Sequence, residues 1–221
     1  MKPLVIAGNW KSNKTIAEAL LWLQDFQRQK PAISHFFRII LCVPFTVLYA
    51  MREEIQIKEL PIILGAENVS PFPEGAETGE ESARMVKDLA DWVIIGHSER
   101  RKNLGETDDL LFKKVARAQE AGLHVIYCVQ NESVLVPKNV DMIAYEPVSA
   151  IGTGESDTPE HANTVITTIK ETSHVPAVLY GGSITEKNIV SFVFQPSLDG
   201  VLVGGASLDP EKFAALIANA R

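Results

Sequence analysis

The sequence predicts an α/β fold: a single (β/α)8 barrel over residues 1–221, with an abbreviated helix after its fifth strand. Short, continuously apolar runs alternate with longer segments of helical periodicity. Continuous rather than alternating hydrophobicity is typical of parallel strands that are covered on both faces. Eight such runs occur without a linker between them, which favours one closed barrel over two small domains.

The eight apolar runs are the expected strands. In a parallel barrel their carboxyl ends all meet at one rim. In chain order they are Leu4–Ala7, Ile39–Val43, Ile62–Gly65, Trp92–Ile95, His124–Cys128, Met142–Tyr145, Ala177–Tyr180 and Gly200–Val203.

Helices are expected between the strands. The segments Thr15–Lys30 and Asp108–Ala121 repeat apolar residues on one helical face. Thr158 and Asp209 each precede a proline and a glutamate, a pattern that predicts an N-cap followed by proline in the first turn.

The connection after the fifth strand is the exception. The stretch from Val129 to Asp141 is short and is interrupted by Pro137, so a full helix is not expected there. The outer face of a parallel strand nevertheless needs apolar cover. Either Val134–Val136 folds back as a partial cover, another subunit provides one, or the adjacent helices close the gap.

Composition limits the classes of function. Apolar residues make up 46% and charged residues 22% of the chain, an ordinary globular balance. The net charge of −7 argues against a nucleic-acid or anionic-membrane partner, so an anionic substrate must be attracted by a local site. Cys42 and Cys128 lie in apolar strands, which indicates buried thiols in a reducing compartment and leaves a disulfide as the lesser alternative. No leader-like or membrane-spanning run is evident, and we expect a soluble, cytoplasmic protein.

Polar residues and glycines follow several predicted strands, where barrel enzymes carry their active sites. Asn9 and Lys11 follow the first strand, His97 the fourth and Glu146 the sixth. Glycine pairs follow the seventh and eighth strands, at 181–182 and 204–205. Each residue alone has an ordinary structural explanation, such as a surface charge or a turn. Those explanations do not predict that all of them meet at one rim.

These residue types permit a specific chemistry. Glycine-rich turns present backbone N–H groups to a phosphate, and Lys11 adds one positive charge. Glu146 can remove a proton from carbon, while His97 can polarise the adjacent carbonyl. Neither a metal-ligand cluster nor a cofactor motif accompanies them, so no metal and no cofactor are expected. Together they describe cofactor-free aldose–ketose isomerisation of a small phosphorylated sugar.

At these residues the sequence resembles the triosephosphate isomerase family over nearly its full length. The most specific segments are Gly96-His97-Ser98-Glu99-Arg100-Arg101 and Tyr145-Glu146-Pro147-Val148, in that order and after the expected strands. The resemblance implies the TIM barrel fold and an isomerase of glycolysis and gluconeogenesis. Its reaction would interconvert D-glyceraldehyde 3-phosphate and dihydroxyacetone phosphate through an enediolate.

The resemblance also implies residue roles. Glu146 resembles the catalytic base, and His97 resembles a neutral electrophile at the start of a short helix near Ser98. Asn9 and Lys11 resemble the residues that steady the enediolate and the substrate charge, with Glu99 paired to Lys11. The implied phosphate-binding residues are Gly152, Ser183, Gly204 and Gly205, with Asn9 and Lys11. The implied lid is Pro147, Val148, Ser149, Ala150, Ile151, Gly152, Thr153 and Gly154.

Assembly is a further implication. Thr78, at the tip of the loop from Glu67 to Glu81, resembles the residue that reaches into a neighbouring subunit's site. Phe72 in the same loop is an apolar side chain with little reason to stand free in water, so the loop is expected to dock near Asn9 and Lys11 of a second subunit. We therefore expect a homo-oligomer, at least a homodimer.

The sequence departs from the family pattern at several points. Ser149 stands where most members have tryptophan, Glu67 replaces a usual glutamine, and residues 155–157 replace the usual hinge, which leaves the rate of lid closure open. The shortening after the fifth strand resembles that of archaeal members.

Two other classes of function compete with this interpretation. Another barrel enzyme of phosphorylated metabolites, such as an amino-sugar isomerase or an aldolase, is the first. An aldolase needs a Schiff-base lysine, and Lys11 lacks the buried apolar setting that would activate it. A non-catalytic paralogue is the second, but Lys11, His97 and Glu146 are all retained.

Overall fold

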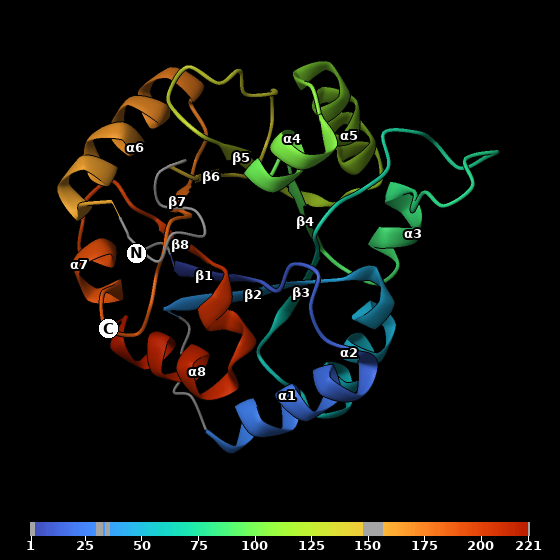
Figure 1. Ribbon diagram of the computed structural model, residues 1–221, viewed down its shortest axis with the longest axis horizontal. Coiled ribbons are helices and arrows are strands. Elements are labelled where there is room, and N and C mark those ends of the chain that lie inside the picture. Colours follow the sequence, from blue (N-terminus) through green and yellow to red (C-terminus); the bar gives the residue numbers. More distant parts are fainter. Residues whose placement is uncertain (1–2, 30–32, 34–35, 148–156, 221) are drawn as a thin grey trace.

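The computed structural model describes residues 3–29, 33, 36–147 and 157–220. Eight parallel strands close into a barrel in which each strand pairs with its neighbours in the chain and β8 pairs with β1 (Figure 1). The strands are β1 (Leu4–Asn9), β2 (Phe37–Val43), β3 (Ile63–Ala66), β4 (Trp92–Ile95), β5 (His124–Val129), β6 (Met142–Tyr145), β7 (Val178–Tyr180) and β8 (Gly200–Val203). The eight predicted strands and the barrel fold are confirmed.

Helices surround the barrel on its outer side (Figure 1). They are α1 (Ile16–Arg28), α2 (Phe45–Ile57), α3 (Ala83–Lys87), α4 (Ser98–Leu104), α5 (Asp108–Glu120), α6 (Pro159–Ser173), α7 (Ile189–Val193), the 3-10 helix η2 (Gly205–Leu208) and α8 (Pro210–Asn219). The predicted N-caps are confirmed: the Thr158 hydroxyl accepts from His161 N, and the Asp209 carboxylate accepts from two backbone N–H groups of α8. No helix among the described residues is long and apolar enough to cross a membrane.

Alternation along the strands divides the core into two layers. Side chains such as Val5, Ala7 and Ala144 fill the barrel interior, while their neighbours in sequence pack outward against the helices. The next inward positions on β1 and β6 are those of Asn9 and Glu146. The alternation therefore aims these two polar side chains at the axis of the barrel, just above its apolar filling.

The connection between β5 and β6 contains turns and no helix in residues 130–141, so the absence of a full helix is confirmed. Val134 and Val136 pack against the core, whereas Leu135 is 65% exposed. This segment thus folds back as a partial cover, which was the first of the expected alternatives. The Gln119 side chain on α5 holds it by donating to the carbonyls of Lys138 and Asn139.

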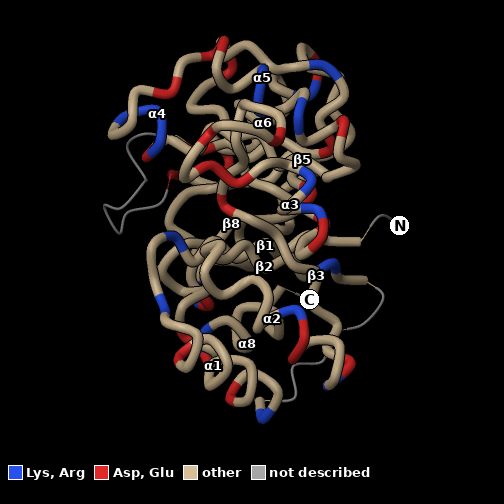
Figure 2. The backbone as a smooth tube through the Cα atoms, turned by 90° about the vertical axis from the view of Figure 1, so that its right-hand side faces the viewer, with Lys and Arg blue, Asp and Glu red and all other residues tan. Residues whose placement is uncertain are grey.

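Charge is dispersed over the surface rather than gathered on one element. Figure 2 shows basic and acidic residues interspersed along the helices and outer loops, with the strands of the barrel mostly neutral. Cys42 and Cys128 lie inside the barrel as free, buried thiols, so the disulfide alternative is wrong. The long connection from β3 to α3 projects away from the barrel (Figure 1).

Candidate active site

The carboxyl ends of the strands enclose a cavity of about 250 Å³. It contains most of the predicted site residues that the structure describes. Asn9 and Lys11 reach it from β1, His97 from β4 and Glu146 from β6. Its lining is Asn9, Lys11, His97, Glu146, Gly181, Gly182, Ser183, Ile184, Thr185, Leu202, Gly204, Gly205 and Ala206.

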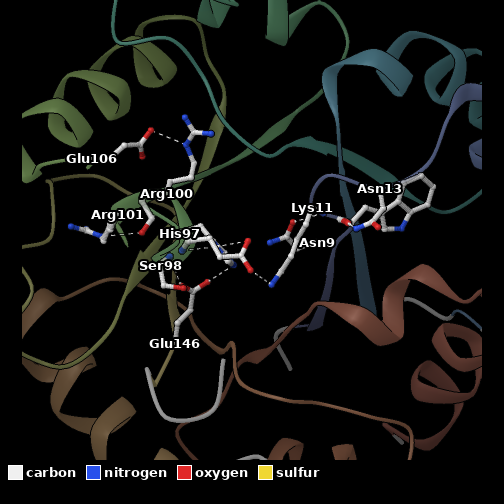
Figure 3. A network of polar contacts seen from close by, with 12 residues as sticks. Asn9, Lys11, Asn13, His97, Ser98, Arg100, Arg101, Glu106 and Glu146 are labelled. Atoms are coloured by element: carbon white, nitrogen blue, oxygen red, sulfur yellow. Dashed lines mark hydrogen bonds and ion pairs between the residues drawn. The ribbon is translucent and has the colours of Figure 1, made fainter. Parts of the chain in front are cut away.

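Glu146 is the most deeply buried acid of this cavity, with 1% of its surface exposed. Its Oε2 accepts a hydrogen bond from the backbone N–H of Ser98 at 2.9 Å (Figure 3). Its Oε1 lies 3.2 Å from Nε2 of His97 and makes no hydrogen bond among the described residues. In this arrangement one carboxylate oxygen is anchored by Ser98 and the other faces the His97 ring.

A glycine makes room for this carboxylate. A Cβ on Gly181, the residue after β7, would lie 3.0 Å from Cγ of Glu146 and 3.2 Å from the Tyr145 carbonyl oxygen. A side chain there would crowd the acid and the strand that carries it. The first glycine of this pair thus has a packing role that its sequence pattern did not reveal.

His97 is the N-cap of α4, and its ring is oriented by the first turn of that helix. Its Nδ1 accepts a hydrogen bond from the backbone N–H of Glu99 at 3.2 Å. A ring nitrogen that accepts such a bond carries no proton, so the imidazole is neutral with its proton on Nε2. The Nε2–H group faces Glu146 and the cavity (Figure 3).

The β4–α4 turn that carries His97 is held from the side by Arg101. The Arg101 guanidinium donates to the carbonyl of Gly96 at 2.9 Å, to Asp108 at 2.7 Å and to the hydroxyl of Tyr127 at 3.0 Å. Gly96 has a φ of 79°, a left-handed conformation that favours glycine. The motif after the fourth strand therefore supplies both the imidazole and the clamp that fixes its turn.

Lys11 brings a positive charge to the same cavity. Its Nζ lies 2.5 Å from Oε1 of Glu99 on α4, so the predicted pair is formed. Its backbone has a φ of 56°, and its N–H donates to the Asn9 side-chain oxygen at 3.1 Å. A Cβ on Gly204 would lie 3.6 Å from Cε of Lys11, which places the ammonium beside the glycine turn after β8.

The loop after β1 is tied to the end of β8 by Trp10. This buried indole donates to the Ser207 carbonyl at 3.1 Å. The Ser207 hydroxyl in turn donates to the Gly204 carbonyl at 2.7 Å. These bonds hold Lys11 and the glycine turn in one arrangement, although they come from opposite ends of the chain.

Two groups of predicted residues are not placed in the cavity. Gly152 and the lid residues 148–154 lie outside the described residues, while Pro147 is buried directly after Glu146. Phe72 is 42% exposed and Thr78 is exposed as well, both on the projecting loop. Neither contributes to the cavity of its own chain.

A second cavity, of about 490 Å³, shares Asn9, Lys11 and His97 with the first and also includes Glu67, Glu99 and Arg100. Burial raises the pKa of Glu67 to about 8, and the nearby Glu99 adds to the rise. Oε1 of Glu67 has no hydrogen-bond partner among the described residues. In the sequence, Glu67 is a departure from the family pattern. The sequence did not predict that this carboxyl group would be buried, because burial depends on the residues that the fold brings around it. Across the described ranges, no three His, Cys, Asp or Glu side chains are grouped to hold a metal ion.

Comparison with known proteins matches this arrangement to one family. The family model described as triosephosphate isomerase matches residues 4–139 and 135–220, two segments that meet in the connection between β5 and β6. The chain is 41% identical to triosephosphate isomerase of Synechocystis sp. over 240 residues, covering 98% of each protein. It is 42% identical over 245 residues to that of Synechococcus sp. strain JA-3-3Ab, covering 98% of this chain and 95% of the relative. It is 38% identical over 245 residues to that of Dehalococcoides mccartyi strain BAV1, covering 98% and 96%.

Proposed function

The chain belongs to the triosephosphate isomerase family, and we propose that Glu146, His97, Lys11 and Asn9 carry out that family's reaction here. The enzyme interconverts D-glyceraldehyde 3-phosphate and dihydroxyacetone phosphate. The observation that carries the assignment of roles is the buried Glu146 carboxylate. One of its oxygens is anchored by Ser98 N, and the other lies 3.2 Å from Nε2 of His97 without a hydrogen bond.

Glu146 acts as the base. It removes the proton from the carbon next to the substrate carbonyl, and the electron pair of the broken C–H bond moves to form the enediolate. The same carboxyl group then returns the proton to the neighbouring carbon, which completes the isomerisation without a net change in composition. Burial among apolar strand residues favours this role, because few waters compete for the carboxylate.

His97 acts as the electrophile. Its neutral ring donates from Nε2 to the substrate oxygens and moves protons between them. A neutral donor suits this step because it can give its proton to the enediolate and take it back. The backbone N–H of Glu99 donates to Nδ1 of His97 and so fixes the tautomer that this step requires.

Lys11 and Asn9 supply electrostatic stabilisation, and the turns after β7 and β8 bind the phosphate. The ammonium of Lys11 beside Gly204 faces both the phosphate and the developing enediolate charge. We assign backbone phosphate contacts to Ser183, Gly204 and Gly205, with Gly152 from the lid. A local site of this kind attracts an anion despite the net charge of −7.

We further propose that residues 147–154 form a lid that excludes water from the enediolate, since water would favour loss of its phosphate. No metal and no cofactor take part. The whole chain, 1–221, acts as one barrel domain in the cytoplasm, without a nucleic-acid or membrane partner.

The active form is a homo-oligomer of at least two chains. In support, the projecting loop carries the exposed Phe72 and Thr78, and the second cavity beside Lys11 offers a groove near the active site. Docking of that loop into the groove of a second copy would bury both. The exposed Leu135 on the β5–β6 connection is a further surface that a subunit could cover, in a particle larger than a dimer.

Glu146→Asp tests the assignment of the base. The shorter side chain withdraws the carboxylate by about an ångström, so kcat should fall about a hundredfold while the fold and phosphate affinity are kept. A coupled assay with glyceraldehyde 3-phosphate measures kcat, and Glu171→Asp, an exposed change on α6, is the matched control. A Glu146→Asp enzyme with more than half the wild-type rate would show that Glu146 is not the base.

A further inference from the structure

Three buried polar atoms near the proposed base lack hydrogen-bond partners among the described residues. They are Oε1 of Glu146, Oγ of Ser98 and Nε2 of Gln130. Buried polar atoms in native proteins are nearly always bonded, because leaving one unpaired is costly. Glu146 and Ser98 already belong to the site described above. Gln130 has no assigned role.

The strand pattern places Gln130 beside Glu146. On β5, Ile126 and Cys128 point into the barrel, so the next inward position is 130. The β5–β6 ladder continues past the last pair of strand residues, since Glu146 N donates to the Val129 carbonyl at 2.8 Å. Gln130 and Glu146 are therefore neighbours across two adjacent strands, both on the inward side. Strands in a sheet lie about 4.8 Å apart, within reach of a glutamine amide.

The reaction creates a need for such an amide. In the described arrangement Oε2 of Glu146 is bonded to Ser98 N. To take a proton from carbon, the carboxylate must turn one oxygen to the substrate and loosen its present contacts. The Cys128 thiol and the small apolar Ala144 lie beside it on the inward face of β5 and β6. A carboxylate oxygen that has only a thiol as its donor would be weakly held, because a thiol is a weak hydrogen-bond donor.

We propose that Gln130 is a positioning residue for the reaction, whose Nε2–H donates to the Glu146 carboxylate while that carboxylate faces the substrate. This inference rests on Glu146 being the base. An uncharged amide suits the task because it steadies the anion without neutralising it. A lysine or arginine at this place would form an ion pair and weaken the base.

Two variants separate the amide from the shape of the side chain. Gln130→Met keeps the length and removes the donor, and Gln130→Glu keeps the shape and replaces the donor by an acceptor. Gln56→Met, an exposed change on α2, is the control. Steady-state kinetics are measured across pH with ordinary substrate and with substrate deuterated at the reacting carbon, and thermal melting checks the fold.

Gln130→Met should lower kcat about tenfold with KM within twofold of wild type, as expected for the loss of one hydrogen bond to a charged group during reaction. As the pH is lowered, the rate of Gln130→Met should begin to fall at a higher pH than the rate of wild type does. The deuterium isotope effect should grow, because proton transfer becomes slower. Gln130→Glu should lose more activity than Gln130→Met at neutral pH, since a second carboxylate would face the base.

A Gln130→Met enzyme with wild-type kcat, isotope effect and pH profile would overturn the proposal, as would a loss confined to KM. If Gln130→Met fails to fold, equal activity of Gln130→Glu and wild type would overturn it instead. The Glu146→Asp measurement keeps the two claims apart. A slow Glu146→Asp with a fully active Gln130→Met refutes only the role of Gln130, whereas a fast Glu146→Asp refutes the base itself.

Discussion

Replacing Glu67 by glutamine should stabilise the protein increasingly as the pH rises from about 5 to 8. Glu67 follows β3, and its Oε1 is buried without a partner among the described residues. Burial raises its pKa from 4.5 to about 8, against the opposing effect of Lys11. Glutamine keeps the shape of the side chain but cannot ionise.

The sign follows from proton binding. An acid whose pKa is higher in the folded state holds more protons folded than unfolded between pH 4.5 and about 8. Its contribution to stability is fully present below pH 4.5 and is lost as the pH rises through that window, then stays level. Each pH unit of separation corresponds to about 1.4 kcal/mol, so the ceiling is about 5 kcal/mol. Relaxation and water entry reduce such penalties, and we expect about 2 kcal/mol at pH 8.5.

The measurement is the free energy of unfolding in urea at pH 5, 6, 7, 8 and 9. Protein concentration is held constant, because assembly would also shift stability. Glu171→Gln on the exposed face of α6 is the control. The difference between Glu67→Gln and wild type should be small at pH 5 and largest above pH 8. A constant difference across this range would refute the reasoning that Glu67 is buried in its protonated form.

Three further changes test the remaining assignments. Lys11→Met should raise KM and lower kcat together, because the Lys11 ammonium faces both the phosphate and the enediolate. Lys113→Met is the control, and an unchanged kcat/KM of Lys11→Met at low salt would contradict this role. Ser149→Trp should release less methylglyoxal and phosphate per turnover than wild type, since tryptophan adds packing surface to the lid. Equal release from the two proteins would mean that residue 149 does not control opening of the lid. Replacing Phe72 and Thr78 by glutamate should dissociate the oligomer, as followed by light scattering, and should lower activity. A fully active monomer would contradict the role of this loop in docking. A wild-type particle with a mass fixed at twice that of the 24.3 kDa chain would contradict cover of Leu135 by a further subunit.

Much of the site could be predicted because its residues lie directly after strands. A strand in a closed parallel sheet is recognised by a short apolar run, and its carboxyl end then has a known location. Asn9, His97 and Glu146 could be assigned to one rim in this way. N-caps such as Thr158 were equally accessible, since a cap is a local interaction between residues three positions apart.

Gln130 escaped the same reasoning, although it also follows a strand. An uncharged amide is ordinary at the end of a strand, and only its burial without a partner distinguishes it. Glu67 is similar: its carboxyl group would be unremarkable if exposed, and its raised pKa depends on what surrounds it. The segment 130–141 could be recognised as too short for a helix, but not which of its residues would cover the barrel.

The sequence by itself determined the order of the strands, the rim to which each polar residue belongs and the chemistry that these residues permit. Local patterns are sufficient for this, because hydrophobic periodicity and capping act over a few positions. Only the tertiary structure decided which atoms meet: Ser98 N with Glu146, 48 positions away, and Lys11 with Glu99, 88 positions away. Such contacts depend on the closure of the barrel and on the angle of α4 against its rim, which no local pattern specifies. Burial has the same origin, since a side chain is buried by residues that the chain brings to it from elsewhere.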